Sequence, residues 1–429
     1  MRSYTWIWLA VFFISLAALD WYVFQGVKTL TAKLRRLITK RFIHFSYWGL
    51  SFLFFAAVLG IVFNLFPGGR FRQVVLVFIF FLFSYLPKLA FALFLAIEDL
   101  YRLARSVFVF LRSRIQNALP GARPEIFESR RKFISQMGLL AASLPFASVL
   151  YGVTEGKYDF RVRRHTLYFP DLPDAFDGFT ITQVSDYHVG SFDNPKAVQK
   201  GVDLIRAQES DLLVFTGDLV NNRAAEMEGW MKIFGGLKAP FGQFSILGNH
   251  DYGDYLGWDS PEAKEKNFTD LKEVQKELGF RLLLNENAEL RKNGSEIRLL
   301  GVENWGRPPF RQRGDLGKAL ERTSPSDFKI LLSHDPSHWD EVVQNFPERI
   351  PLTLSGHTHG MQFGIEIPGW QWSPVKYRYP HWAGLYREDD RYLYVNRGFG
   401  YLGFPGRVGI WPEVTVITLK KGRIANQIV

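Results

Sequence analysis

Three stretches in the first hundred residues are long and apolar enough to cross a lipid bilayer. They run from Tyr4 to Phe24, from Phe45 to Phe66 and from Val74 to Ile97, and they are rich in Phe, Leu, Val and Trp. A helix needs about 20 apolar residues to cross a hydrocarbon core about 30 Å thick. A fourth stretch, Phe133 to Val153, is less apolar and either spans the bilayer or lies in its interface; its length and flanks favour a span. The sequence therefore predicts a membrane region of about four transmembrane helices over residues 1–153.

Two charged residues, Asp20 and Lys88, interrupt the predicted spans. A charge inside a membrane can indicate function, but we expect these two to snorkel to the interface or to pair inside the bundle. A transporter or channel carrying a regulatory domain would need more polar residues within its spans. That alternative is therefore disfavoured.

The basic residues gather in the membrane region. Residues 1–154 hold 18 of the 52 Lys and Arg and 5 of the 42 Asp and Glu, a net charge of +13. The remainder of the chain carries a net charge of −3. A near-neutral C-terminal part argues against a basic face for nucleic acid, so no nucleic-acid partner is expected.

The same charges predict the orientation of the chain. The first loop between spans holds six basic residues and residues 102–132 hold eight, whereas the loop between the second and third spans has only Arg70 and Arg72. Loops rich in Lys and Arg stay in the cytoplasm. Four spans then predict an integral membrane protein with residues 154–429 on the periplasmic or extracellular side. The absence of cysteine is compatible with export but does not test it.

The segment that leads into the fourth stretch, "ESRRKF", allows two interpretations. Arg130 and Arg131 followed by an apolar run resemble a twin-arginine export signal, here inside the chain and not at its start. Alternatively, the two arginines only hold this loop on the inner side. Both interpretations predict export of the residues beyond the fourth stretch.

From Asp159 onward the pattern is that of an α/β domain. Five strand-like runs each end in small and polar residues: "FTITQVSDYH", "DLLVFTGDLV", "GQFSILGNHD", "FKILLSHDP" and "PLTLSGHTHG". Helical segments are predicted over 195–208 and 224–237, and further strands over 296–300, 392–396 and 414–419. The alternation predicts a sheet-centred α/β fold with additional β structure.

The ends of these five runs supply an unusual set of side chains. In open α/β sheets, ligand-binding residues collect at the carboxyl ends of the strands. Seven candidates are Asp186, His188, Asp218, Asn249, His334, His357 and His359. Seven ligands exceed one four-coordinate ion but suit two ions about 3.5–4 Å apart that share a bridging carboxylate. Nitrogen and oxygen donors without thiolate suit Mn, Fe or Zn, and affinity alone does not choose among them.

In chain order, D-x-H, G-D, G-N-H-D, H and G-H-x-H resemble the five blocks of the calcineurin-like metallophosphoesterases. The resemblance extends from Asp159 to the C-terminal end, and the spans with the "SRRKF" junction resemble the membrane-anchored bacterial branch of that family. It implies a four-layer αββα sandwich over residues 154–429. It also implies a site with two divalent metal ions that hydrolyses phosphomonoesters, phosphodiesters or pyrophosphates by a metal-activated hydroxide.

The resemblance also implies a role for each residue of the blocks. Asp186, His188 and His359 would hold the first ion, Asn249, His334 and His357 the second, and Asp218 would bridge the two. His250 would lie beside the scissile phosphate, where it stabilises charge or protonates the leaving oxygen. Asp251 would orient the His250 imidazole.

Three further features carry alternatives. Arg397 and Arg407, in a glycine-rich stretch, either contact substrate phosphate or hold a tight turn at the sandwich edge. The aromatic-rich insertion over 369–386 would form a lid, recognise an aromatic group, touch the bilayer surface or pack on the core. His338 is expected outside the metal ligands, behind them or in solvent.

The predicted function is a membrane-anchored dimetal phosphohydrolase. Its substrate would be a phosphodiester or pyrophosphate, with a lipid-linked or cell-envelope phosphoester favoured by location and family analogy. The alternative of a catalytically inactive phosphate-ligand sensor is disfavoured because no ligand of the blocks is missing. No P-loop sequence is present. The sequence leaves the oligomeric state open.

Overall fold

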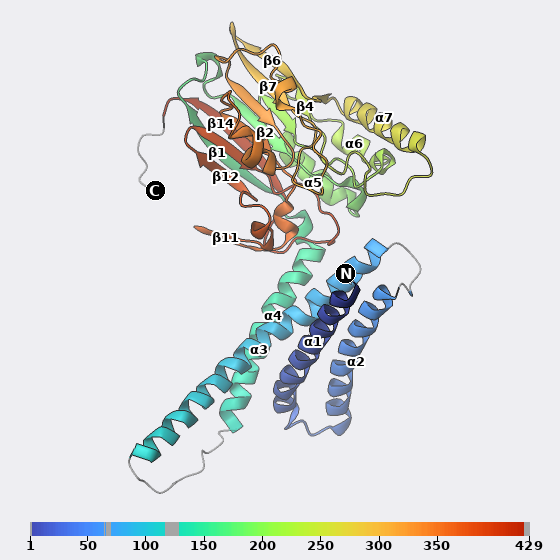
Figure 1. Ribbon diagram of the computed structural model, residues 1–429, viewed down its shortest axis with the longest axis vertical. Coiled ribbons are helices and arrows are strands. Elements are labelled where there is room, and N and C mark those ends of the chain that lie inside the picture. Colours follow the sequence, from blue (N-terminus) through green and yellow to red (C-terminus); the bar gives the residue numbers. More distant parts are fainter. Residues whose placement is uncertain (1, 64, 66–69, 116–127, 424–429) are drawn as a thin grey trace. The chain divides into compact units, whose positions relative to one another are not determined.

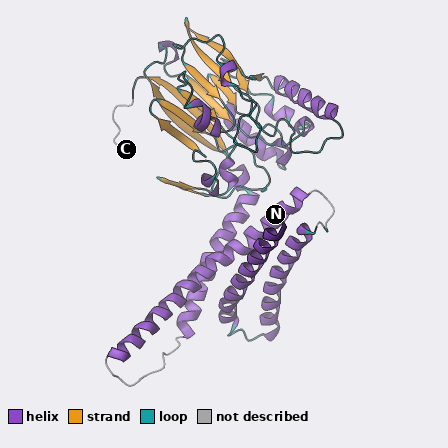
Figure 2. Ribbon diagram, in the orientation of Figure 1, coloured by secondary structure: helices purple, strands orange, loops and turns teal. Residues whose placement is uncertain are grey.

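The computed structural model describes residues 2–63, 65, 70–115 and 128–423 (Figure 1). The chain divides into two compact units, residues 1–151 and 152–429. Figure 2 shows the helices and strands of each unit. The side chains of Arg130 and Arg131 lie outside the described residues, so the interpretation of that junction stays a prediction.

The first unit is built from apolar helices. They are α1 (Arg2–Thr31), α2 (Leu37–Val62), α3 (Arg70–Ile115) and α4 (Glu128–Thr154). Each has a segment long and apolar enough to cross a membrane, which agrees with the predicted four spans. α3 continues 18 residues beyond the predicted end at Ile97, because residues 98–115 contain no Pro or Gly that would stop a helix.

The two charges of the spans pair with each other. Lys88 Nζ on α3 lies 2.7 Å from Asp20 Oδ1 on α1 and 3.0 Å from Ser51 Oγ on α2. The hydroxyls of Tyr85 and Tyr47 donate to the Asp20 carboxylate and to its backbone oxygen at 3.0 and 2.7 Å. This pairing satisfies polar groups that would otherwise be costly in an apolar environment, as expected from the sequence.

The second unit holds two six-stranded sheets. Their orders are β1-β14-β2-β3-β4-β5 and β12-β13-β9-β8-β7-β6. The first contains β1 (Arg161–Phe169), β2 (Thr180–Val184), β3 (Leu212–Phe215), β4 (Gln243–Ser245), β5 (Arg281–Leu282) and β14 (Glu413–Lys421). The second contains β6 (Glu286–Lys292), β7 (Ser295–Gly301), β8 (Lys329–Leu332), β9 (Leu352–Ser355), β12 (Gly384–Glu388) and β13 (Arg391–Val395).

The central strands are parallel and apolar. β2, β3 and β4 pair in parallel in one sheet, and β7, β8, β9 and β13 in the other. β3, β8 and β9 are buried at every position, as expected for strands covered on both faces. This burial explains why these runs read as continuous apolar segments.

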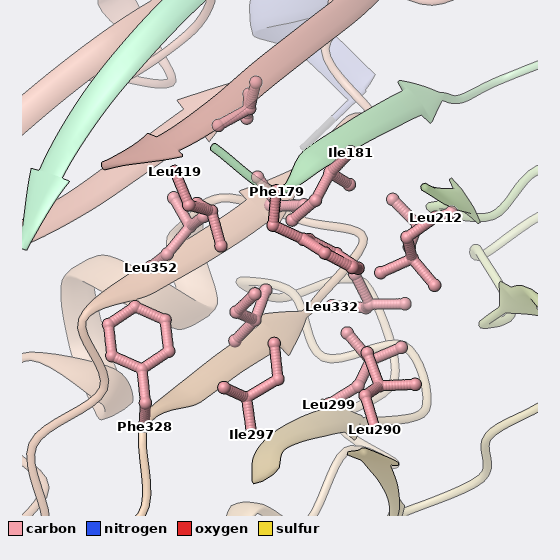
Figure 3. Packing of buried hydrophobic residues seen from close by; sticks show 14 of the residues in the cluster. Phe179, Ile181, Leu212, Leu290, Ile297, Leu299, Phe328, Leu332, Leu352 and Leu419 are labelled. Atoms are coloured by element: carbon pink, nitrogen blue, oxygen red, sulfur yellow. The ribbon is translucent and has the colours of Figure 1, made fainter. Parts of the chain in front are cut away.

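The core lies between the two sheets. Side chains of the first sheet, such as Ile181 and Leu212, belong to the same buried cluster as Leu299, Leu332 and Leu352 of the second. Figure 3 shows these side chains between the strands of both sheets. Their packing fixes the two sheets against each other and therefore aligns the strand ends of both.

Helices cover the outer faces unequally. α5 (Pro195–Arg206), α6 (Met231–Phe234) and α7 (Pro261–Glu277) contribute to a buried cluster on the first sheet. The second sheet is covered by α8 (Leu316–Ala319) and by a single wide turn, η5 (Trp339–Val343). The predicted layers are therefore present, with a thin fourth layer. The predicted helix over 224–237 is broken, because Gly229 adopts φ +87° between two short helical segments.

A separate two-stranded sheet lies at the start of the aromatic-rich insertion and includes three residues just before it. It pairs β10 (Ile365–Ile367) with β11 (Trp370–Trp372). In Figure 1 the strand labelled β11 lies apart from the two six-stranded sheets.

Candidate metal centre

The seven predicted ligands follow five strands whose carboxyl ends meet. Residues 186 and 188 follow β2, residue 218 follows β3 and residue 249 follows β4 in the first sheet. Residue 334 follows β8, and residues 357 and 359 follow β9, in the second sheet. Because these strands are parallel within each sheet, their ends place the side chains at one edge of the sandwich.

Two groups of possible metal ligands form there. One contains Asp186, His188 and His359. Within each group the donor atoms lie within 4.8 Å of one another. His359 Nε2 lies 3.2 Å from Asp186 Oδ1, and the same carboxylate accepts the backbone N–H of His357 at 3.0 Å.

The second group contains Asp218, His334 and His357, and Asn249 adjoins it. Asn249 Oδ1 lies 2.8 Å from His357 Nδ1, which is itself 3.3 Å from His334 Nε2. The amide nitrogen of Asn249 donates to the Tyr255 hydroxyl at 2.9 Å. This bond turns the amide oxygen, the atom that can bind a metal, toward the histidines.

One oxygen of Asp218 lies between the two groups. Asp218 Oδ2 is 3.4 Å from His188 Nε2 and 3.2 Å from His334 Nε2. The other oxygen accepts the backbone N–H of His250 at 2.8 Å. The carboxylate therefore offers one free oxygen to both groups, the arrangement that a bridging ligand requires.

The donor set fits divalent ions. Both ring nitrogens of His188 and the Nε2 atom of His359 are buried without a hydrogen-bond partner among the described residues. Buried polar atoms are normally paired, and a metal ion would supply the missing partner. His334 donates from Nδ1 to the Thr216 carbonyl at 2.7 Å, which leaves its Nε2 lone pair for a metal.

The electrostatic field of the centre is negative. Burial lowers the pKa of His334, but the carboxylates of Asp218 and Asp186 outweigh it and raise this pKa to about 10. Burial has the opposite effect on an acid and acts to raise the pKa of Asp186. The neighbouring His359 nevertheless holds this pKa below its ordinary value. Two buried carboxylates with strong attraction for positive charge are what a cation site needs.

Glycines bring the loops of the two sheets together. A Cβ atom on Gly356 would collide with Ser185 Oγ and with Asp186 Oδ2, and one on Gly248 would collide with the Asp218 carboxylate. Gly217 adopts φ +95°, which permits the sharp turn before Asp218. The close approach of these loops is therefore possible only without side chains at 248 and 356.

His250 adjoins the two groups. Its ring centroid lies 4.9 Å from that of His188. Its Nδ1 lies 2.8 Å from the backbone oxygen of Asn221, so Nδ1 carries the proton and Nε2 is left for a substrate. Burial lowers the pKa of His250, although the Asp218 carboxylate opposes this effect.

Asp251 has other partners than the His250 imidazole that it was expected to orient. The Asp251 carboxylate accepts backbone N–H groups of residues 218, 219 and 248 at 2.8–2.9 Å, while the backbone oxygen of Asn221 accepts the imidazole N–H. The side chains of His250 and Asp251 point in different directions, although the two residues are consecutive. Asp251 thus holds the two ligand-bearing loops, and it is a positioning residue.

Arg397 and Arg407, which were considered for contact with substrate phosphate, both have buried side chains. Arg397 pairs with Glu413 at 2.6 Å and with Glu366 at 2.8 Å. Arg407 donates to the carbonyls of Arg397, Gly398 and Gly400 and lies 3.2 Å from His359 Nδ1. The alternative interpretation, a held turn, is the one the structure supports.

Sequence reasoning missed Tyr379 and Asp335. The Tyr379 hydroxyl lies 2.9 Å from His357 Nε2 and 3.4 Å from Asp335 Oδ2, and Asp335 Oδ2 is itself 3.4 Å from His357 Nε2. A metal-binding histidine commonly donates its outer N–H to such a partner. The position of Asp335 directly after His334 was the available signal for one of them; nothing in the sequence distinguishes Tyr379 from its aromatic neighbours.

His338 lies outside both groups. It is buried, with its Nδ1 2.9 Å from Ser333 Oγ, and burial lowers its pKa to about 4. It is therefore a neutral packing residue, neither a ligand nor a solvent-facing group.

Two families match the chain. Residues 179–361 match the family described as Calcineurin-like phosphoesterase. Residues 1–157 match the family described as Probable Calcineurin-like phosphoesterase, transmembrane domain.

Similar proteins carry related descriptions. The chain is 32% identical over 300 residues to an uncharacterized metallophosphoesterase, YkuE, of Bacillus subtilis, a match that covers 68% of this chain and 98% of the relative. It is 28% identical over 293 residues to a transmembrane protein with metallophosphoesterase domain of Danio rerio, covering 66% of this chain and 62% of that protein. A phosphopantetheinyl hydrolase of Mycobacterium tuberculosis superposes at 13% identity with a TM-score of 0.29, over 47% of this chain and 89% of that one.

Proposed function

Because this chain belongs to the calcineurin-like metallophosphoesterases and carries a four-helix membrane region, we propose that it hydrolyses a phosphodiester or pyrophosphate at a membrane surface. The family itself indicates a membrane-associated phosphoric ester hydrolase. Our proposal adds the number of ions, the substrate and the side of the membrane.

One observation carries the proposal of two ions. Asp218 Oδ2 lies within 3.4 Å of a histidine of each ligand group. A single ion would leave one of the two groups without a function. In the first group it would also leave buried nitrogens of His188 and His359 without a partner. Asp186, His188 and His359 would hold one ion, His334, His357 and Asn249 the other, and Asp218 both.

The residues of the chain divide the chemistry among them. Two divalent ions, when bound, supply water activation near neutral pH and neutralisation of phosphate charge. His250 donates its Nδ1–H to the Asn221 carbonyl, so its Nε2 is left toward the substrate. Nε2 would deliver a proton to the leaving oxygen after taking one up from solvent. Asp251 keeps Asp218 in place through the backbone of the 218–219 loop.

The membrane region supports a lipid-linked or cell-envelope substrate. A catalytic domain that is covalently attached to four spans meets membrane phosphoesters at a high local concentration. The basic loops between the spans support placement of this domain on the periplasmic or extracellular side. A sensor that had lost catalysis is not favoured, because every ligand position is filled by a competent donor.

The test is hydrolysis of a chromogenic phosphodiester by the detergent-purified full chain. The protein is stripped of metal and then supplied with Mn²⁺, Zn²⁺ or Mg²⁺. An Asn249→Ala variant removes one ligand oxygen, and Asn345→Ala, at an exposed position away from the centre, is its matched control. We expect activity only with added metal, a loss of at least about 100-fold in the Asn249 variant and none in the control.

Metal content measured on the same samples separates the alternatives. Two ions per chain with activity would support the dimetal hydrolase. Folded protein that binds metal but hydrolyses no phosphoester in a broad panel would favour the sensor. Folded protein that binds no metal would overturn the proposal.

A further inference from the structure

The β10–β11 hairpin has its polar face turned inward. Its strands pair Ile365 with Trp372, Glu366 with Gln371 and Ile367 with Trp370. Because side chains alternate along a strand, Glu366 and Gln371 share one face and the four apolar residues share the other. A two-stranded sheet on a protein surface normally packs its apolar face on the core.

Ion pairs hold the polar face against the domain. Glu366 lies 2.8 Å from Arg397 Nη2 and 2.7 Å from Arg163 Nη2. Gln371 donates to the backbone oxygen of Ala383 at 3.2 Å. The orientation of the hairpin is therefore fixed by specific contacts, and its apolar face has to point away from the domain.

That outer face is exposed. Ile365, Ile367 and Trp370 are 49%, 55% and 51% exposed. Among the described residues of the unit 152–429, eight large hydrophobic side chains are exposed, and six of them lie between residues 361 and 385. Such a concentration of apolar side chains marks an interaction surface. We call Ile365, Ile367, Trp370 and the 78%-exposed Tyr377 the hairpin patch.

The root of the hairpin is tied to the end of the fourth apolar helix. Phe363 forms a β-bridge with Val408, and Gly364 donates to the Val408 carbonyl at 2.9 Å. The neighbouring Arg407 N–H donates to the carbonyl of Gly152 at 3.0 Å. Gly152 lies in the last turn of α4, whose apolar segment ends at Thr154. The hairpin therefore starts at the point where the chain leaves its last candidate span.

From these observations we propose that the hairpin patch docks on the surface of the lipid bilayer. Trp and Tyr are the residues that prefer the membrane–water interface. Lys376, which is exposed beside Tyr377 with its Nζ 5.5 Å from that ring, adds a positive charge suited to anionic headgroups. A bilayer surface is the partner that lies within reach of a segment tied to the end of a span.

Docking would bring the metal centre to the membrane surface. Ile365 follows the ligand His359 by six residues, and Ser373, directly after β11, donates to the Gly360 carbonyl at 2.8 Å. Further along the same segment, the Tyr379 hydroxyl contacts the ligand His357. This part of the inference rests on the proposed function: the preferred substrates are phosphoesters presented by lipids at that surface.

The absence of cysteine allows a direct test in the full chain. A single cysteine is introduced as Ile367→Cys and, as the control, as Lys266→Cys at a 75%-exposed side chain on α7. Each is labelled with an environment-sensitive fluorophore and placed in nanodiscs of phosphatidylethanolamine and phosphatidylglycerol. We expect the label at 367 to be quenched by doxyl-labelled lipid and protected from aqueous iodide, and the label at 266 to show the opposite.

Two results would overturn docking. Iodide quenching at 367 equal to that at 266 would mean that the patch stays in water. Protection from both quenchers would mean that protein, from a second copy or from this chain, covers the patch. Neither readout depends on catalysis, so docking stands or falls separately from the proposed function.

The link to substrate has its own measurement. Hydrolysis of a nitrophenyl phosphodiester carrying a long alkyl chain in vesicles is compared with that of a soluble nitrophenyl phosphodiester. In Ile367→Ser with Trp370→Ser, the ratio of lipid to soluble rates should fall at least tenfold, while Lys266→Ser keeps the ratio. An unchanged ratio in an active enzyme would separate docking from substrate choice and overturn the preference for lipid substrates.

Discussion

The residues of the metal centre adopt an uncommon backbone conformation. Five of the seven predicted ligands have positive φ: Asp186, His188, Asp218, His357 and His359, at 53°, 46°, 60°, 72° and 50°. Asp and His are among the few side chains enriched in this region, and each such residue costs about 1–3 kcal/mol unless its surroundings hold it. Here the contacts of Asp251 and Thr216 and the close packing at the glycines hold these residues in that conformation.

The negative charge of the centre makes stability depend on metal. The buried carboxylates of Asp186 and Asp218 repel each other, and cations between them would remove this cost. Chelation should therefore lower the melting temperature, and excess Mn²⁺ or Zn²⁺ should restore it. At metal concentrations 100 times the Kd, one site contributes about 2.7 kcal/mol. A thermal melt with and without chelator measures this effect, and a Tm independent of metal would contradict it.

Tyr379 offers a prediction about the outer contacts of a ligand. Tyr379→Phe removes the hydroxyl that lies 2.9 Å from His357 Nε2 while keeping the ring. Loss of such a partner typically costs about 10–100-fold in metal affinity or activity. Chelator competition measures the affinity, and Tyr377→Phe, at an exposed position, is the control. Equal affinities in the two variants would assign Tyr379 to packing alone.

Asp251 offers a prediction about stability. Asp251→Ala would leave three buried N–H donors, of residues 218, 219 and 248, without an acceptor. Each unsatisfied donor costs about 1–3 kcal/mol, so the free energy of unfolding should fall by about 3 kcal/mol or more. Denaturant unfolding of the metal-free protein measures this loss of unfolding free energy without a contribution from metal binding. A loss below about 1 kcal/mol would contradict the prediction.

The gathering of the candidate ligands in two groups could be predicted from the sequence, because strand ends and short spacings define their positions. Their partners could not be predicted. The contact of Tyr379 with His357 depends on the path of the chain over the 22 positions that separate them, and six aromatic residues of the insertion had an equal claim. The Arg397–Glu413 pair depends on two strand ends meeting in space, so the sequence left both interpretations of Arg397 open.

At the level of elements, turns decide whether the strand ends can meet. Gly356→Ala would push a methyl group into Ser185 and Asp186, so we expect the loss of metal from the first group and at least about a 100-fold loss of activity. Gly257→Ala is the control, because no atom lies within 4 Å of its added Cβ. Metal content and near-UV circular dichroism distinguish local damage from unfolding. Normal metal content in the Gly356 variant would show that the loops can separate without harm.

Elements with continuous apolar runs were predicted from the sequence, and irregular ones were not. The apolar runs became β2, β3, β4, β8 and β9 because both sheet faces are covered. The hairpin β10–β11 was not predicted. Its apolar and polar residues alternate as in any half-buried strand, but here the apolar face is the exposed one. Gly229 split a predicted helix through a single positive φ value.

At the scale of the whole molecule, the composition changes near residue 154, and the chain divides into the compact units 1–151 and 152–429. Every strand of both six-stranded sheets lies between residues 161 and 421, and the three buried clusters of the sandwich lie in the same unit. Composition cannot predict which loops the two sheets bring together, because those contacts arise from the tertiary packing.

This division predicts that residues 152–429 fold without the spans. The isolated domain should unfold cooperatively, bind metal and hydrolyse soluble phosphodiesters at a rate within about threefold of the full chain, since no sheet or buried cluster of the sandwich is lost. Circular dichroism, metal analysis and the chromogenic assay check these points. A domain that aggregates without the membrane region while the full chain is monodisperse in detergent would contradict the prediction.

The orientation of the chain can be tested in cells with the Lys266→Cys variant. A membrane-impermeant maleimide should label it in intact spheroplasts. Loops rich in Lys and Arg stay in the cytoplasm, so the domain after the fourth span should lie on the opposite side of the membrane. A cysteine at Leu34, in the first basic loop, should be labelled only after lysis. The reverse pattern would place the catalytic domain in the cytoplasm.

The pairing of β1 with β14 has a consequence for how the protein is made. β14 lies between β1 and β2, with Arg161 through Phe169 in register with Glu413 through Lys421. The ribosome therefore has to release residue 421 before the first sheet can close, and until then the backbone edges of β1 and β2 that pair with β14 have no partner strand. A channel that threads unfolded chain can deliver such a domain across the membrane as it is synthesised. A carrier of folded cargo would have to wait until the whole polypeptide had been completed, with the preceding spans already in the bilayer.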